Sequence, residues 1–204
     1  MGIQERLVVK IRKLMPSVKK LLNEVYKLNP ETNSYIFEIR LNHYTDIFNE
    51  LDPSPLKRRD LDQDFISYME DSSLDIPIKY NIELHFLIPE NIKDEKKEER
   101  IKAGISTFYN FNTLYIMREL SRLYREAALF FVISLGSLFT SFFISSFPEH
   151  NYFFKIIVEG FNIGGWVFLW EAINILIFKA RKYRLEIKRY KRLHDAEIVF
   201  HSND

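Results

Sequence analysis

The chain has 204 residues, a formal net charge of +1 and no cysteine. The length allows one ordinary domain, or a small domain plus membrane helices. The balanced charge excludes the strongly basic face of a nucleic-acid-binding protein, so we expect no nucleic-acid partner. The lack of cysteine excludes disulfides, thiol catalysis and Cys-ligated metal sites. Uninterrupted apolar sequence is concentrated after Ala127, and most charged residues lie before it or after Phe178.

The N-terminal region predicts an amphipathic helix over residues 3–28. Its apolar residues recur at spacings of three and four, and the rest of its surface is mostly basic. The apolar positions are Leu7, Ile11, Leu14, Val18, Leu21, Leu22 and Val25. Such a helix could lie on the anionic inner leaflet of a membrane, or it could pack on its own domain. Both alternatives stay open.

A small α+β domain is predicted next. Strict alternation of apolar residues indicates one strand within residues 34–42 and a second within 79–88. Between them we expect a helix over 61–69, with Asp60 as its N-terminal cap. A third, weaker strand is expected over 196–201. If both ends of the chain lie on the same side of a membrane, this strand can return and complete the sheet.

The segment from Leu51 to Ser73 contains a proline-rich loop followed by charged residues. Its candidate site residues are Asp52, Pro53, Ser54, Pro55, Arg59, Asp60 and Asp62. We expect residues 52–55 to form a rigid loop, and Arg58, Arg59, Asp60 and Asp62 to form an ion-paired surface. Another protein or a small anion could dock there. The spacing of Asp60, Asp62 and Asp64 superficially matches a calcium loop, but the required glycine and glutamate are missing, so helix capping is preferred.

The sequence predicts no catalytic residue, no metal and no cofactor. His43 with Asp46, or His85 with Glu83 and Glu38, could be drawn as acid–base or metal sites. No spacing supports these groupings, and exposed surface residues explain them more simply. Phosphate-binding glycine loops, nucleophile elbows and zinc-protease motifs are all missing from the sequence. We therefore expect a protein that is not an enzyme, with an enzyme acting at the membrane surface as a remaining alternative.

Two segments are long and apolar enough to cross a membrane. Residues 127–147 carry no charge and, at about 1.5 Å per residue, would span about 31 Å, which matches a hydrocarbon core of about 30 Å. Residues 156–178 follow after a short connection, so the two segments predict a transmembrane hairpin. Basic residues flank the hairpin and are scarce in its tip, 148–154. The protein is therefore expected in the cytoplasmic (inner) membrane with both termini cytoplasmic.

The second apolar segment carries polar residues on one face. At about 100° per residue, one arc of about 140° contains Glu159, Asn174, Glu171, Gly160 and Gly164. The two glycines form a GxxxG pair, which permits close approach of another helix. In one interpretation this face packs on the first helix or on a neighbouring subunit, with Glu171 protonated. In the other, the two acids line an oligomeric ion or proton path.

Two stretches resemble an uncharacterised family of small bacterial two-helix membrane proteins. The first is the LDPSP…RDLD motif within residues 51–73. The second comprises Gly165, Trp166, Val167 and Trp170. The resemblance, which spans most of the chain from about residue 35, implies an α/β segment followed by two C-terminal transmembrane helices, and it implies no activity. In that family a basic residue and a proline follow the second tryptophan, so Glu171 and Ala172 depart from the pattern.

The expected fold class is α+β, with a small cytoplasmic sheet-and-helix domain attached by a long helix to a C-terminal two-helix transmembrane hairpin. The expected parts are an amphipathic basic helix (1–30), a cytoplasmic α+β domain (31–92), a connecting helix (93–126), the hairpin (127–178) and a returning basic helix and strand (179–204). We predict an oligomeric membrane protein that permeabilises the membrane as a channel-like, defence-type bacterial effector under the control of its cytoplasmic domain. The alternative is a non-conducting membrane anchor or adaptor for a cytoplasmic protein complex. The expected partners are the lipid bilayer, further copies of the chain and, as a candidate, a cytoplasmic protein.

Overall fold

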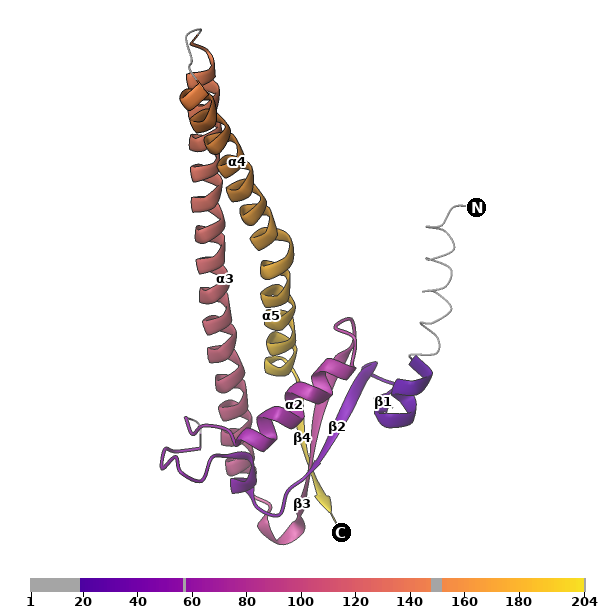
Figure 1. Cartoon of the computed structure of the whole chain (residues 1–204). Helices are drawn as coiled ribbons and strands as arrows, with labels where there is room; N and C mark the ends of the chain where they lie inside the picture. Colours follow the sequence, from indigo (N-terminus) through magenta and orange to yellow (C-terminus); the bar gives the residue numbers. More distant parts are fainter. Residues whose placement is uncertain (1–18, 57, 148–151, 204) are drawn as a thin grey trace, which may run out of the picture. The chain divides into compact units, whose positions relative to one another are not determined.

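The computed structural model describes residues 19–56, 58–147 and 152–203 (Figure 1). The fold is mixed α+β, as predicted, with a four-stranded sheet, several helices and two long apolar helices. The chain divides into two compact units. Unit 1 comprises 1–112 together with 188–204, and unit 2 comprises 113–187.

Unit 1 contains one sheet in the order β1-β2-β3-β4 (Figure 1). Its strands are β1 (Lys27–Asn29), β2 (Ser34–Arg40), β3 (Asn81–Pro89) and β4 (Glu197–Asn203). β1 pairs antiparallel with β2, whereas β2, β3 and β4 are mutually parallel. Parallel neighbours require a crossover connection. Helix α2 (Gln63–Asp75) lies in the first crossover, and all of unit 2 lies in the second. The apolar hairpin is therefore an insertion between two adjacent strands of one sheet.

The strand predictions for β2, β3 and β4 are confirmed, but β1 was not foreseen. Residues 3–18 of the predicted helix over 3–28 lie outside the described residues. From there the chain is helical only as far as residue 25, and Lys27–Asn29 forms a strand. Apolar residues recur at spacings of three and four only as far as Val25. The predicted helix continued to residue 28 and was therefore too long at its C-terminal end. The pairing of β1 with β2 is set by the turn between them rather than by the periodicity of residues 27–29.

The prediction for α2 was wrong about its cap and its length. Asp62, and not Asp60, caps the helix, and its side chain accepts hydrogen bonds from the backbone N–H groups of Asp64 and Phe65. Leu61 forms a β-bridge with Phe48, which keeps the chain extended up to Asp62. The expected range was 61–69, whereas α2 runs over Gln63–Asp75. This long-range bridge, which leaves no mark in local periodicity, delays the start of the helix.

The hydrophobic core of unit 1 lies on one face of the sheet. Alternate residues of β2 and β3 face α2 and the first turns of α3 (Glu95–Ser145), and the end of α5 (Ala180–His194) packs there too. Fully or almost fully buried side chains include Tyr35, Phe37, Leu84, Phe86, Met69, Ile101, Ile105, Tyr109 and Leu193. The chain thus leaves the sheet and returns to it through helical turns that are themselves part of this core.

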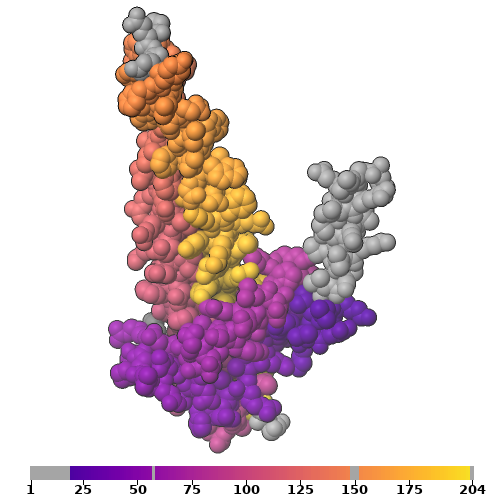
Figure 2. Space-filling model, viewed as in Figure 1, coloured from indigo at the N-terminus to yellow at the C-terminus, as the bar shows by residue number. Residues whose placement is uncertain are grey.

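Unit 2 contains the later part of α3, helix α4 (Tyr152–Asn174), a π-helix η3 (Ile175–Lys179) and the start of α5. Figure 2 shows α3 and α4 in contact along the hairpin. Both apolar helices are long and apolar enough to cross a membrane. Only 17% of the most apolar stretch of each is buried, whereas the core helix of a soluble protein would be mostly buried. This exposure supports association with a membrane.

Candidate functional site

Serine hydroxyls of α3 hold α4 by its backbone. Ser134, Ser137 and Ser141 donate hydrogen bonds of 2.8, 2.7 and 3.0 Å to the carbonyl oxygens of Gly165, Phe161 and Val158, respectively. The nearby hydroxyl of Thr140 instead donates to the Gly136 carbonyl in its own helix. We call the three contacts between the serine hydroxyls of α3 and the carbonyl oxygens of α4 the hydroxyl seam. It is specific because each donor meets a carbonyl on one face of α4.

Gly165 is the residue that permits the seam. A Cβ atom there would lie 2.6 Å from Cγ of Leu138 and 3.2 Å from its backbone nitrogen. The GxxxG pair plays no such part within the chain: a Cβ atom on Gly160 would meet nothing within 4 Å, and one on Gly164 would meet only the Ser137 hydroxyl, at 3.8 Å. The close approach of the two helices therefore requires Gly165, which the sequence pattern did not single out.

Within the polar arc of α4, Glu159 and Gly160 do not pack on the first helix, whereas Gly164 lies next to Ser137 of that helix. The hydroxyl seam uses the face that contains Val158, Phe161 and Ala172, on the other side of α4. Glu159 and Gly160 are exposed, and Glu159 makes no hydrogen bond or ion pair with any described residue. Because the serines bind backbone carbonyls, the seam does not need polar side chains on α4. Packing of the arc on a neighbouring subunit stays a prediction.

Glu171 has a cationic partner within its own chain. Its carboxylate accepts hydrogen bonds from Lys179 at 2.7 Å and from Asn174 at 3.2 Å. Lys179 ends the π-helix η3, whose wider turn lies between these two residues. Because Lys179 neutralises the carboxylate, Glu171 does not need to be protonated to be accommodated here. The pairing of Lys179 with Glu171 was not predicted, since eight residues of separation is not a standard helical pairing distance.

The proline-rich loop of the Leu51–Ser73 segment is closed by Asp52. Its carboxylate accepts hydrogen bonds from the backbone N–H groups of Ser54 and Asp60. These bonds, the one from Asp60 above all, hold the pKa of Asp52 below its ordinary value. The expected ion-paired surface is not formed, because Arg59 donates instead to the carbonyl oxygens of Asn49 and Glu50. A rigid loop is therefore present, but hydrogen bonds to the backbone, not ion pairs, stabilise it.

The predicted anion-docking residues line a small pocket. Arg58, Arg59 and Asp60 surround a cavity of about 270 Å³ together with Thr107 and aromatic residues of α3. Beneath it the loop and α3 approach closely, since a Cβ atom on Gly104 would lie 2.7 Å from the Leu56 carbonyl oxygen. The structure thus places three of the predicted residues together, and docking there stays a prediction.

Glu83 was assigned to an exposed strand face, and this was wrong. Only 4% of the residue is exposed, and hydrogen bonds from Thr32, Asn29 and His85 surround its carboxylate. Asn33 adopts a positive φ of 55° in the turn before β2, a conformation that asparagine tolerates, and this turn brings Thr32 to Glu83. Burial alone would raise the pKa of Glu83, but the three hydrogen bonds outweigh it and lower the pKa.

The two histidine groupings that the sequence did not favour are only partly formed. His85 does contact Glu83 at 3.2 Å, and its second ring nitrogen lies 3.0 Å from His201 of β4. Glu38 takes no part and pairs with Lys27 instead. Asp46 accepts hydrogen bonds from the backbone of Asn42 and His43, which is a turn-capping role. No three His, Asp or Glu side chains are placed to hold a metal ion together within the part of the chain that the structure describes.

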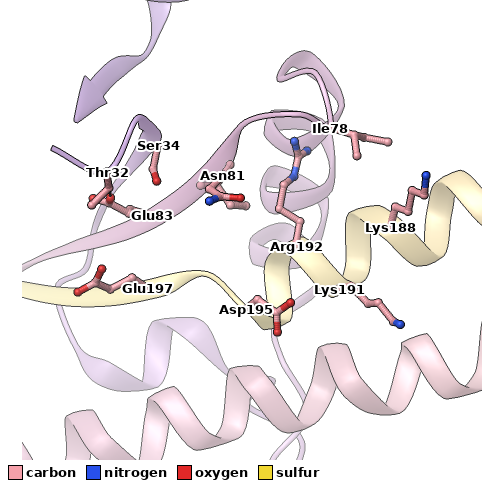
Figure 3. Close-up of a pocket in the computed structure, with 11 residues that line it drawn as sticks. Thr32, Ser34, Ile78, Asn81, Glu83, Lys188, Lys191, Arg192, Asp195 and Glu197 are labelled. Carbon is pink, nitrogen blue, oxygen red and sulfur yellow. Dashed lines mark hydrogen bonds between the residues drawn. The ribbon is translucent and has the colours of Figure 1, made fainter. Parts of the chain in front are cut away.

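A larger pocket, of about 520 Å³, lies beside Glu83 (Figure 3). It is lined by the first residues of β2, β3 and β4 and by the last turns of α5. On one side stands Arg192, whose guanidinium donates to the carbonyl oxygens of Ser73, Ile76, Pro77 and Tyr80 at 2.5–3.3 Å. It thereby satisfies the free carbonyls at the end of α2, which has no basic residue in its own last turn. No sequence motif indicated this role.

Replacing Thr32 by valine is expected to lower the free energy of unfolding of unit 1 by about 1 kcal/mol at neutral pH. A carboxylate with a lowered pKa stabilises the fold above its ordinary value of 4.5, and this contribution disappears as the pH falls through the folded-state value. The deficit of Thr32→Val should therefore shrink below about pH 4.5. Urea unfolding of the full chain in detergent, followed by hydrogen exchange of β3, measures it. The exposed Thr45→Val is the control, and a pH-independent deficit would contradict the assigned role of Glu83.

Comparisons with protein-family models, with curated proteins and with solved structures find no match to this chain.

Proposed function

We propose that the chain is an integral protein of the cytoplasmic membrane, which it spans by the α3–α4 hairpin. Unit 1 and both termini would lie in the cytoplasm. Two apolar helices with largely exposed side chains support this, together with the basic residues at both inner ends of the hairpin.

Glu159 carries the functional part of the proposal. It is exposed on an apolar helix and has no partner among the described residues, and a carboxyl group in hydrocarbon is costly. Gly160 beside it leaves room for a second backbone. We propose that copies of the chain associate through this face of α4 and enclose the acid. Because the seam already covers the opposite face, association leaves the hairpin intact.

The proposed output is a change in membrane permeability under the control of unit 1. An acidic face shared by several copies can provide a polar path for ions or protons. Unit 2 is inserted between β3 and β4, so a partner or signal that acts on the sheet acts on both chain connections to the hairpin. We propose a toxic or defence-type effector on this basis, with no catalytic step of its own.

The pairing of Glu171 favours a second candidate, a non-conducting anchor or adaptor. The carboxylate of Glu171 accepts hydrogen bonds from Lys179 and Asn174 of its own chain. This acid therefore does not need a water-filled channel to solvate it. In that case the hairpin would only hold unit 1 beside a cytoplasmic partner complex.

Liposomes that contain the purified chain are expected to conduct ions, and Glu159→Leu should reduce the flux. The same variant should weaken self-association in detergent by about three- to twentyfold, because interhelical hydrogen bonds in membranes contribute about 0.6–1.7 kcal/mol. Ion flux is measured with a dye that responds to the membrane potential of the liposomes, and association by sedimentation equilibrium.

Glu171→Leu is the matched control, since it makes the same substitution in the same helix. It should retain most of the flux, because the Glu171 partners lie in its own chain. If Glu171→Leu abolishes flux while Glu159→Leu does not, the proposed path is wrong. If none of the three proteins conducts, the permeability function is wrong and the anchor remains.

A further inference from the structure

The pocket beside Glu83 has the size of a small-molecule site. Its volume of about 520 Å³ lies within the usual range of about 300–1,000 Å³. Ser34, Asn81 and Glu197 stand at or beside the first residues of three parallel strands, and Lys188 and Lys191 line the side contributed by α5 (Figure 3). Every one of these residues belongs to unit 1.

Two of the charged residues that line the pocket already have hydrogen-bond partners within the protein. Glu83 is occupied by Thr32, Asn29 and His85, and the terminal nitrogens of Arg192 are occupied by carbonyl oxygens and by Ser73. Of the other charged residues that line the pocket, three make no hydrogen bond or ion pair with any described residue: Lys188, Lys191 and Glu197. Among the described residues, the pocket therefore presents two ammonium groups without a protein partner and two carboxylates, that of Glu197 and that of Asp195, whose cationic partner is His194 at 3.8 Å.

Ser34 is the most informative residue of the pocket. It is only 4% exposed, yet its hydroxyl makes no hydrogen bond to any described residue. The hydroxyl is not one of the buried side-chain atoms that lack a partner, so it is accessible from the pocket that Ser34 lines. Asn81, which is Ser34's partner in the β2–β3 register, is exposed, and its side-chain amide makes no hydrogen bond with any described residue.

We propose that this pocket binds a small phosphorylated molecule that carries hydroxyl groups, of the class of sugar phosphates and mononucleotides. Lys188 and Lys191 bind the phosphate, whose charge of about −1.5 to −2 at neutral pH matches two ammonium groups. Glu197 accepts hydrogen bonds from the hydroxyl groups, as carboxylates do from ribose. Ser34 and Asn81 bind the polar atoms between these ends. A metal ion fits less well, because the described acids and histidines do not converge on one point.

Calorimetric titration of the full chain in lipid nanodiscs tests the proposal. The probes are ribose 5-phosphate, adenosine 5′-monophosphate, ribose and inorganic phosphate. Ribose 5-phosphate or the nucleotide should bind at least about tenfold more tightly than ribose or phosphate alone, because each charge-assisted end contributes on the order of one tenfold step. The difference between these two ligands shows whether a sugar phosphate or a nucleotide is preferred.

Lys188→Gln combined with Lys191→Gln should weaken binding of the better ligand by about a hundredfold, and Glu197→Gln by about tenfold. Lys96→Gln combined with Lys182→Gln removes the same charge at exposed positions outside the pocket and should leave affinity unchanged. The replaced side chains are solvent-exposed, so the fold is retained, which circular dichroism verifies.

The proposal is overturned if neither phosphorylated ligand binds at about millimolar concentration, or if both lysine pairs have the same effect. Equal affinity for inorganic phosphate and for ribose 5-phosphate would also overturn it, since the hydroxyl end would then contribute nothing. The inference does not depend on membrane permeability, because the pocket lies wholly within unit 1.

Discussion

Replacing Arg192 by leucine is expected to destabilise unit 1 by about 3–5 kcal/mol, the range for removing one partner of a buried charged network. Arg192 is 9% exposed and makes five hydrogen bonds to the segment between Ser73 and Tyr80. Leucine would leave the carbonyl oxygens at the end of α2 buried without donors. Arg192→Lys should recover only part of the loss, because a single ammonium cannot reproduce the planar fork.

Hydrogen exchange of the full chain in detergent measures this effect. The slowest amides of β3 report the opening of unit 1, and their exchange should accelerate in proportion to the lost free energy. Arg189→Leu is the matched control, since it removes an arginine from the same helix that makes no hydrogen bond with any described residue. Equal protection of β3 in the two variants would show that Arg192 is not the contact that joins α5 to the end of α2.

Gly165→Leu is expected to separate α3 from α4 within unit 2. Any side chain at this position meets Leu138 well inside van der Waals contact, and the nearest backbone atom is only 3.2 Å away. The helices must move apart, and the Ser134 bond to the Gly165 carbonyl is then lost. The combined cost should reach about 2–4 kcal/mol, from overpacking and one hydrogen bond. Gly160→Leu should leave the seam intact, because that site is open.

The lack of cysteine makes this test direct, because introduced cysteines are the only ones in the chain. Phe130→Cys with Phe168→Cys places a pair across the seam, where the two rings stack with centroids 6.0 Å apart. Cross-linking of this pair should fall strongly with Gly165→Leu and persist with Gly160→Leu. The reverse result would mean that the GxxxG face forms the seam. Both tryptophans lie in α4, so their fluorescence reports on unit 2 alone.

Local patterns were sufficient to predict β2, β3, β4 and the apolar helices. Alternation in a strand and continuous hydropathy in a helix are properties of neighbouring residues, so the sequence shows them directly. Partnerships across the chain were not predictable. The Thr32–Glu83 and Ser73–Arg192 contacts join residues far apart in sequence, and no motif marks either pair. The helix α2 is capped by Asp62 and not by Asp60, because the β-bridge between Phe48 and Leu61 delays the start of the helix. This is likewise a non-local effect.

The candidate sites show the same division. The sequence located an acidic, glycine-containing arc on α4, and that arc exists as a helical face. Which face packs was not determined by the pattern, because the donors of the seam bind backbone carbonyls, which every residue of α4 possesses. Lys179 was also hidden, since only the π-helix η3 brings it to Glu171.

By itself, the sequence determined that this protein has two helices fit for a membrane and an α+β part formed from both ends of the chain. Composition and periodicity carry that information because burial and hydropathy act residue by residue. The packing of the chain established that Gly165 and three serines join the hairpin, that Glu159 has no hydrogen-bond or ion-pair partner among the described residues, and that a polar pocket opens beside the buried Glu83. Each of these depends on register and distance between remote segments, which are set when the chain packs.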